Sequence, residues 1–100
     1  MRRTFVAMAA QSHAVDVPPV EVVLSEVVAN LAMLAHAYVE PPVADGAEPA
    51  APDFASAGIA LDVAGAAFER IEPRLDPQQR AAVARLLTES RLSYVKKRGS

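Results

Sequence analysis

Two histidines, His13 and His36, are the side chains best suited to metal binding in a chain that has no cysteine. A protein zinc site needs three or four ligands, commonly spaced one helical turn apart. Among the residues three or four positions from His36, Glu40 is the only histidine, aspartate or glutamate. We therefore expect no metal site and no cofactor.

Ser56, Ser90 and Ser93 are candidate nucleophiles, but no histidine and aspartate accompany them in the sequence. A serine hydroxyl is a weak nucleophile unless an adjacent base activates it. The four glycines are scattered, so they form no phosphate-binding loop. The sequence therefore predicts no catalytic residues and a protein that is not an enzyme.

A basic segment, "RLSYVKKR", occupies residues 91–98. Arg91, Lys96, Lys97 and Arg98, beside a single tyrosine, are a candidate contact for nucleic-acid phosphates. The net charge of −2 argues against a dedicated nucleic-acid binder. The competing interpretation is a solvated helix end, where cations suit the negative end of the helix dipole.

The composition predicts one small folded domain that is short of apolar surface to bury. The chain has 100 residues, of which 52% are hydrophobic and 22% are charged. Many of the hydrophobic residues are alanines, which bury little area each. The free energy gained by burying so little apolar surface is nearly cancelled by the conformational entropy lost on folding. Self-association is the simplest way to bury more apolar surface and stabilise the fold.

Residues 1–17 predict a poorly ordered N-terminal arm, followed by a single helical domain at 18–97. The most apolar segment, residues 20–39, includes Glu21, Glu26, Asn30 and His36. A transmembrane span has about 20 residues with few or no charges. We therefore expect this segment to be a helix covered by protein, in a cytoplasmic chain with no membrane span.

The first helix is predicted at about residues 19–38, because prolines open it at 18 and 19 and end it at 41 and 42. A Pro/Ala-rich linker follows at 40–53, and it either folds the chain back or crosses to another subunit. The predicted core stripe of the first helix is Val20, Val23, Leu24, Val27, Leu31, Leu34 and Tyr38.

The second helix is predicted at about residues 54–71, capped by Asp53 and ended by Pro73. Gly58 and Gly65 each cost roughly 1 kcal/mol of helix propensity, so close packing against a neighbouring helix must compensate. Its predicted core residues are Phe54, Leu61 and Phe68 at seven-residue spacing, with Ala57, Ala64 and Ile71 beside them.

The third helix is predicted at about residues 77–97 and forms a helical hairpin with the second. Asp76, Pro77 and Gln79 form the pattern of a capping box. Arg91 is placed to pair with an acid of the second helix such as Asp62, which would pin the hairpin. The predicted core stripe is Ala82, Val83, Leu86, Leu87, Ser90 and Tyr94.

Two of these helices carry a second apolar stripe, opposite the first. Val22 and Met33 repeat on the first helix, and Leu92 and Val95 repeat on the third. A second stripe indicates a further buried contact, with a copy of the chain or with a partner helix. The alternative is that these side chains face water harmlessly.

One ordered series of motifs runs through the chain. "LDPQQ" at 75–79 precedes a Leu-Leu pair at 86–87 and "RLSYV" at 91–95, and "LDVA" at 61–64 and "VVLSEVVANLAMLA" at 22–35 lie upstream. Over about residues 20–96 this series resembles the bacterial family catalogued as domain of unknown function 1844. Ala82 and Ser90 depart from its pattern of larger apolar residues. The resemblance implies a small helical bacterial protein of uncharacterised role and brings no catalytic residues.

The sequence as a whole predicts an all-α protein of three helices within a helical homo-oligomer. Its expected function is that of a non-enzymatic assembly or adaptor module, which self-associates or docks a partner protein through apolar helix faces. The alternative is a small nucleic-acid-associated regulator that uses the basic C-terminal helix end.

Overall fold

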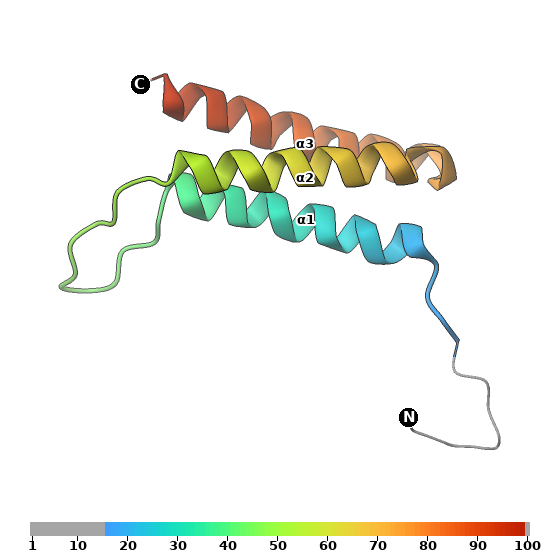
Figure 1. Ribbon diagram of the computed structural model, residues 1–100, viewed down its shortest axis with the longest axis horizontal. Helices are drawn as coiled ribbons and strands as arrows, with labels where there is room; N and C mark the ends of the chain where they lie inside the picture. The colour runs from blue at the N-terminus through green and yellow to red at the C-terminus, as the bar shows by residue number, and fades with distance from the viewer. Residues whose placement is uncertain (1–15, 100) are drawn as a thin grey trace, which may run out of the picture.

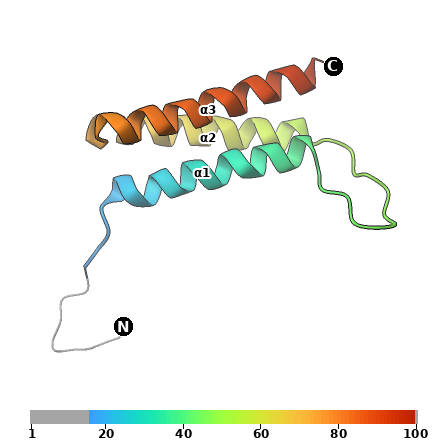
Figure 2. The ribbon, with the colours of Figure 1, turned by 180° about the vertical axis from the view of Figure 1, so that it is seen from behind.

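Three helices run side by side in the computed structural model, which describes residues 16–99 (Figures 1 and 2). α1 spans Val20–Val39, α2 spans Phe54–Ile71 and α3 spans Pro77–Arg98, with one 3-10 turn, η1, at Glu72–Arg74. Consecutive helices are antiparallel, so α1 and α3 run in the same direction. The all-α prediction is confirmed, with no strand among residues 16–99 and helix bounds within one residue of those expected.

The predicted N-terminal arm, residues 1–17, lies outside the described residues except for its last two. Asp16 and Val17 are exposed and precede the first helix.

Side-chain caps fix the starts of α2 and α3, as the sequence predicts. The Asp53 carboxylate accepts hydrogen bonds from the Ser56 N–H at 2.9 Å and the Ser56 hydroxyl at 2.7 Å. At α3, the Gln79 N–H donates to the Asp76 carboxylate at 2.8 Å, and the Asp76 N–H donates to the Gln79 side chain at 3.3 Å. These bonds satisfy N–H groups that the first helical turn leaves without partners.

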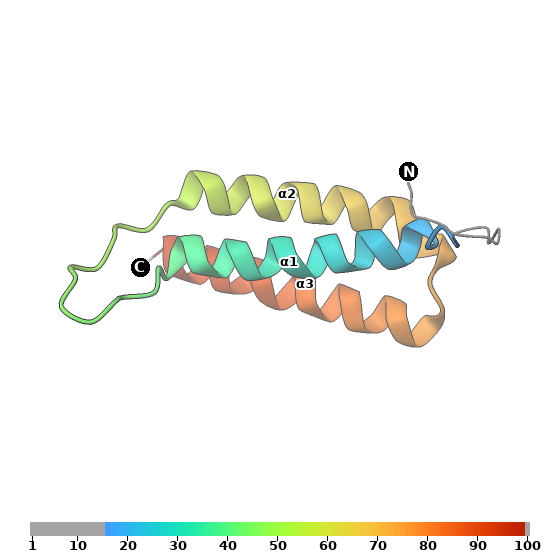
Figure 3. The same cartoon turned by 90° about the horizontal axis from the view of Figure 1, so that it is seen from below.

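In the single chain, the linker at residues 40–53 folds α2 back against α1. The Asp53 N–H donates to the Tyr38 carbonyl at 2.8 Å, so the two ends of the loop meet. Gly46 turns the loop at a φ of 76°, in the left-handed region that glycine adopts without steric cost. Closure of this loop makes α1 and α2 antiparallel neighbours (Figure 3).

Small side chains form the core. Five of the eleven buried apolar residues are alanines, and the largest fully buried side chains are Ile71, Leu87 and Val28. Val28, Ala64 and Leu87 join all three helices, and a second cluster joins α1 and α2 near the linker. Alanine lets helices approach closely but buries little area, so the core is thin.

The face of α1 that enters the core differs from the predicted one. The predicted stripe on α1 is displaced by one residue, about 100° around the helix. Val20, Val23, Leu34 and Tyr38 are exposed, and Leu24, Val27 and Leu31 are only half-buried. The physical reason is size, because only small side chains fit where two other helices approach α1. The buried residues of α1 are Val28, Ala32, Ala35 and Val39.

The predicted core residues are buried more often on α2 than on α3. On α2, Ala57, Leu61, Ala64 and Ile71 are buried, and Phe54 and Phe68 are half-buried. On α3, Leu87 alone is buried. Ala82 is exposed, which corrects its assignment to the core. The remaining members of that stripe are half-buried: Val83, Leu86, Ser90 and Tyr94.

Gly58 and Gly65 lie two turns apart on α2, and both face side chains of α3. A Cβ at position 58 would lie 3.2 Å from the Tyr94 hydroxyl oxygen. A Cβ at position 65 would overlap the Arg91 guanidinium. The predicted close packing is therefore confirmed at Gly58, whereas the atoms over Gly65 are the far end of the exposed Arg91 side chain.

Candidate functional site

A broad apolar surface lies on the side of α1 and α2 that α3 does not cover. We call it the outer α1–α2 face and define it by six large side chains that are 37% to 65% exposed. They come in two runs at helical spacing, so each run lies along one side of its helix. The six are Val20, Val23, Leu34 and Tyr38 of α1 and Ile59 and Val63 of α2.

This surface follows from the way in which α1 is packed. Alanines at positions 32 and 35 let α1 approach the other helices closely. Leu34, one position before Ala35, is 46% exposed, whereas Leu31 packs partly against the core. Only four of the 20 residues of α1 are buried. The most apolar of the three helices thus leaves several large side chains exposed.

A shallow groove of about 210 Å³ lies within the outer α1–α2 face, near the linker. No charged side chain lines it, and its hydroxyl groups belong to Tyr38 and Ser56. Ser56 already donates its hydroxyl hydrogen to Asp53. The groove suits apolar contact rather than chemistry. Its lining residues are Leu31, Leu34, Tyr38, Ser56, Ile59 and Ala60.

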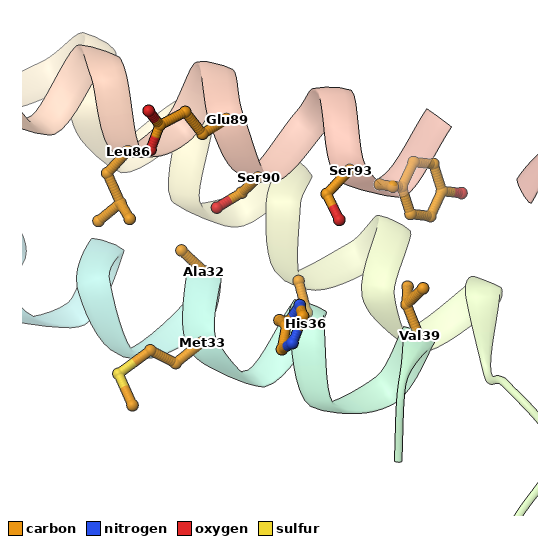
Figure 4. Close-up of a pocket in the computed structure, with 10 residues that line it drawn as sticks. Ala32, Met33, His36, Val39, Leu86, Glu89, Ser90 and Ser93 are labelled. Atoms are coloured by element: carbon orange, nitrogen blue, oxygen red, sulfur yellow. The ribbon is translucent and has the colours of Figure 1, made fainter. Parts of the chain in front are cut away.

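A second groove, of about 340 Å³, separates α1 from α3. In Figure 4, Leu86 and Ser93 of α3 point toward α1, and Ala32 of α1 points toward α3. The Glu89 carboxylate points away from α1, and Met33 points away from α3. This groove is therefore a mainly apolar gap with serine hydroxyls along one side.

The described residues form no arrangement typical of acid–base or metal chemistry. His36 Nε2 lies 3.5 Å from the Glu40 carboxylate, and both side chains are largely in solvent. Residues 16–99 contain no cluster of three His, Cys, Asp or Glu side chains that could hold a metal ion. His13 lies outside the described residues.

The four residues predicted to form an interface, Val22, Met33, Leu92 and Val95, are all 46% to 70% exposed in the single chain. They do not form one surface. Met33 lies at the edge of the α1–α3 groove, on the side of α1 away from α2. Leu92 and Val95 lie on the side of α3 that faces away from the groove-lining residues. The sequence therefore identified two separate apolar patches, and their role as interfaces stays a prediction.

The predicted basic contact is partly engaged within the chain. Lys97 Nζ lies 2.6 Å from the Glu40 carboxylate, and this hydrogen bond lowers the Glu40 pKa. The Arg98 guanidinium stacks over the Tyr94 ring, 5.9 Å from its centroid, and donates to the Tyr94 hydroxyl at 3.4 Å. Lys96 also has an interaction within the protein. Nucleic-acid binding by this end stays a prediction.

The predicted ion pair between Arg91 and Asp62 is absent from the described part of the chain, whereas Arg74 pairs with Glu21 and Lys97 pairs with Glu40. Arg91 instead lies over Gly65. An arginine stem can cover apolar surface while its charged group stays in water. Asp62 is exposed on α2.

Sequence reasoning missed Ile59 and Val63, which complete the outer α1–α2 face. A signal for them exists in the sequence. Positions 56, 59, 63, 66 and 70 alternate steps of three and four residues, the spacing of one helix side. The predicted core residues of α2 occupy one side of the helix, and Ile59 and Val63 lie on another.

By length and composition, α1 is also able to cross a membrane, although core helices of soluble proteins pass the same test. No known protein family, curated protein or solved structure matches this chain. The resemblance to domain of unknown function 1844 therefore stays a prediction.

Proposed function

We propose that this chain is a non-enzymatic association module whose activity is to bury its apolar helix faces against another protein surface. The observation that carries the proposal is the packing of α1, where Val28, Ala32, Ala35 and Val39 are buried. The large side chains left exposed on α1 include Val20, Val23, Leu34 and Tyr38. Burial of apolar surface is the main driving force of protein association. Surfaces that concentrate large apolar side chains mark contact sites.

The composition supports the same function. A thin alanine core gives a 100-residue chain little stability of its own. Anything that binds the folded state and not the unfolded state adds to the stability of the fold. Association would therefore both hold the helices together and connect this chain to its assembly.

Light scattering coupled to size exclusion tests the proposal over a range of protein concentrations. We expect the mass to rise above the 10.6 kDa of one chain. Leu34→Glu should lower the mass, because a carboxylate buried in an apolar contact has no partner. A mass of one chain at every concentration would contradict self-association.

Leu92→Glu is the matched control, since Leu92 is exposed on α3 and lies off the outer α1–α2 face. We expect Leu92→Glu to leave the mass unchanged. A loss of mass in Leu92→Glu alone would move the contact to the α3 patch formed with Val95. Circular dichroism of both variants should show unchanged helix content.

A further inference from the structure

We propose that the occupant of the outer α1–α2 face is a second copy of this chain, packed with α1 against α1 and α2 against α2, antiparallel. The twofold axis passes beside Val63. This inference rests on the proposed function and adds the partner, the surface and the orientation.

The size of the face fits a dimer contact. Twenty residues make α1 about 30 Å long, and two adjacent helices of about 10 Å diameter make the face about 20 Å wide. The resulting footprint of about 600 Å² approaches the roughly 800 Å² per partner of a stable complex. A pair of helices that meets an identical pair forms a four-helix layer, which is a common way to bury such stripes.

The outer stripe of α2 is symmetric about Val63. This stripe consists of positions 56, 59, 63, 66 and 70. An antiparallel copy sets Val63 against itself and sets Ile59 against the small Ala66 and Ala67 of the other chain. The bulky side chain of each copy thus meets a small one, as close packing requires.

The midpoint of the outer stripe of α1 lies level with Val63 of α2. A single twofold axis can therefore pass beside the midpoints of both stripes. The hydrogen bond between Asp53 N and the Tyr38 carbonyl places these two positions side by side. Because the helices are antiparallel, ten residues beyond Asp53 on α2 lie level with ten residues before Tyr38 on α1. Val63 is therefore level with Val28, and the stripe from Val20 to Tyr38 is centred one position away.

Charge favours the antiparallel orientation. Arg70 is the one charged residue in the outer stripe of α2, at its C-terminal end. The antiparallel arrangement sets Arg70 level with Ser56 of the other copy, beside the Asp53 carboxylate that Ser56 contacts. In the alternative dimer, the twofold axis would run parallel to the helices and both linkers would lie at the same end. The linker acids Asp45 and Glu48 of the two copies would then repel each other.

Disulfide trapping tests this arrangement directly, because the chain has no cysteine of its own. Val63→Cys should form a covalent dimer under mild oxidation, since residues beside a twofold axis bring their Cβ atoms to the roughly 3.5–4.5 Å that a disulfide needs. Leu92→Cys is the control, because Leu92 is more exposed than Val63 and lies on α3. We expect no covalent dimer from Leu92→Cys above the level given by random collision.

Charge reversal tests the orientation. Arg70→Glu places a carboxylate next to the Asp53 carboxylate of the other copy and should weaken the dimer about tenfold at low salt, and less at high salt. Arg85→Glu, at an exposed position of α3, should leave the dimer unchanged.

The outcomes separate this inference from the proposed function. Trapping at Leu92 and not at Val63 would overturn the surface proposed here while association itself stands. A mass of one chain with no trapping would overturn this inference and the self-association part of the proposed function. Binding of the single chain to phosphatidylcholine vesicles, lost in Ile59→Glu, would assign the face to lipid and overturn the second copy as its occupant.

Discussion

Replacement of Gly65 by alanine should stabilise the protein, although a Cβ at this position overlaps the Arg91 guanidinium. Alanine is favoured over glycine inside a helix by about 0.8–1.0 kcal/mol. The overlapping atom is the far end of a flexible, exposed side chain, which can swing into solvent at small cost. We expect Gly65→Ala to raise the free energy of unfolding by roughly 0.5–1 kcal/mol.

Gly58 provides the matched comparison, because the Tyr94 side chain over Gly58 cannot move as freely as the Arg91 side chain over Gly65. A Cβ there lies 3.2 Å from the Tyr94 hydroxyl, and the Tyr94 ring packs edge-on against Phe54 with centroids 6.1 Å apart. A half-buried ring held in this way gives up packing when it moves. Gly58→Ala should therefore gain less than Gly65→Ala, about 0–0.5 kcal/mol.

Urea denaturation followed by circular dichroism measures both effects, at one fixed protein concentration because association contributes to stability. Arg91→Ala serves as the background control, in which Gly65→Ala should show the full helix-propensity gain of about 1 kcal/mol. Destabilisation by Gly65→Ala of more than about 1 kcal/mol would refute the reasoning. It would mean that Arg91 is held rigidly over α2.

Three further predictions concern the core, the caps and pH. Leu87→Ala should lower the free energy of unfolding by about 2–5 kcal/mol in a urea titration, because Leu87 is buried where the three helices meet; an effect below about 1 kcal/mol would contradict that position. Asp76→Ala should cost about 1 kcal/mol in the same assay through loss of the capping box, and Asp76→Asn should restore most of it. The pKa of Glu40 is lowered by Lys97 and that of Asp53 by Ser56, so the stability from these groups is present above their ordinary values of 4.5 and 3.8 and is lost as the pH falls through the lowered values. Thermal midpoints measured from pH 6 to pH 3, in steps of about half a pH unit, check this prediction. We expect the midpoint of Asp53→Asn to fall less over this range than that of the unmodified chain.

The helix ends were predictable because their causes lie within four residues of sequence. Asp53 and Asp76 each accept a hydrogen bond from an N–H three positions later, and Pro73 ends the preceding helix as expected. Local chemistry of this kind does not depend on what the helix packs against.

The core side of α1 was not predictable in the same way, because α1 is apolar around most of its circumference. Periodicity favoured the side with the largest residues, including Leu31 and Leu34. Packing of three helices favoured the side with Ala32 and Ala35, where close approach is sterically allowed. The side of α1 that was predicted to be core is therefore the side that contributes to the outer α1–α2 face.

The dependence of the thermal midpoint on protein concentration tests the central claim most directly. If a second surface covers the large side chains of α1, then dilution removes part of the stability of the fold. We predict that the midpoint rises steadily with concentration, and that Leu34→Glu removes this dependence. A midpoint that is the same at every concentration for the unmodified chain would contradict the account.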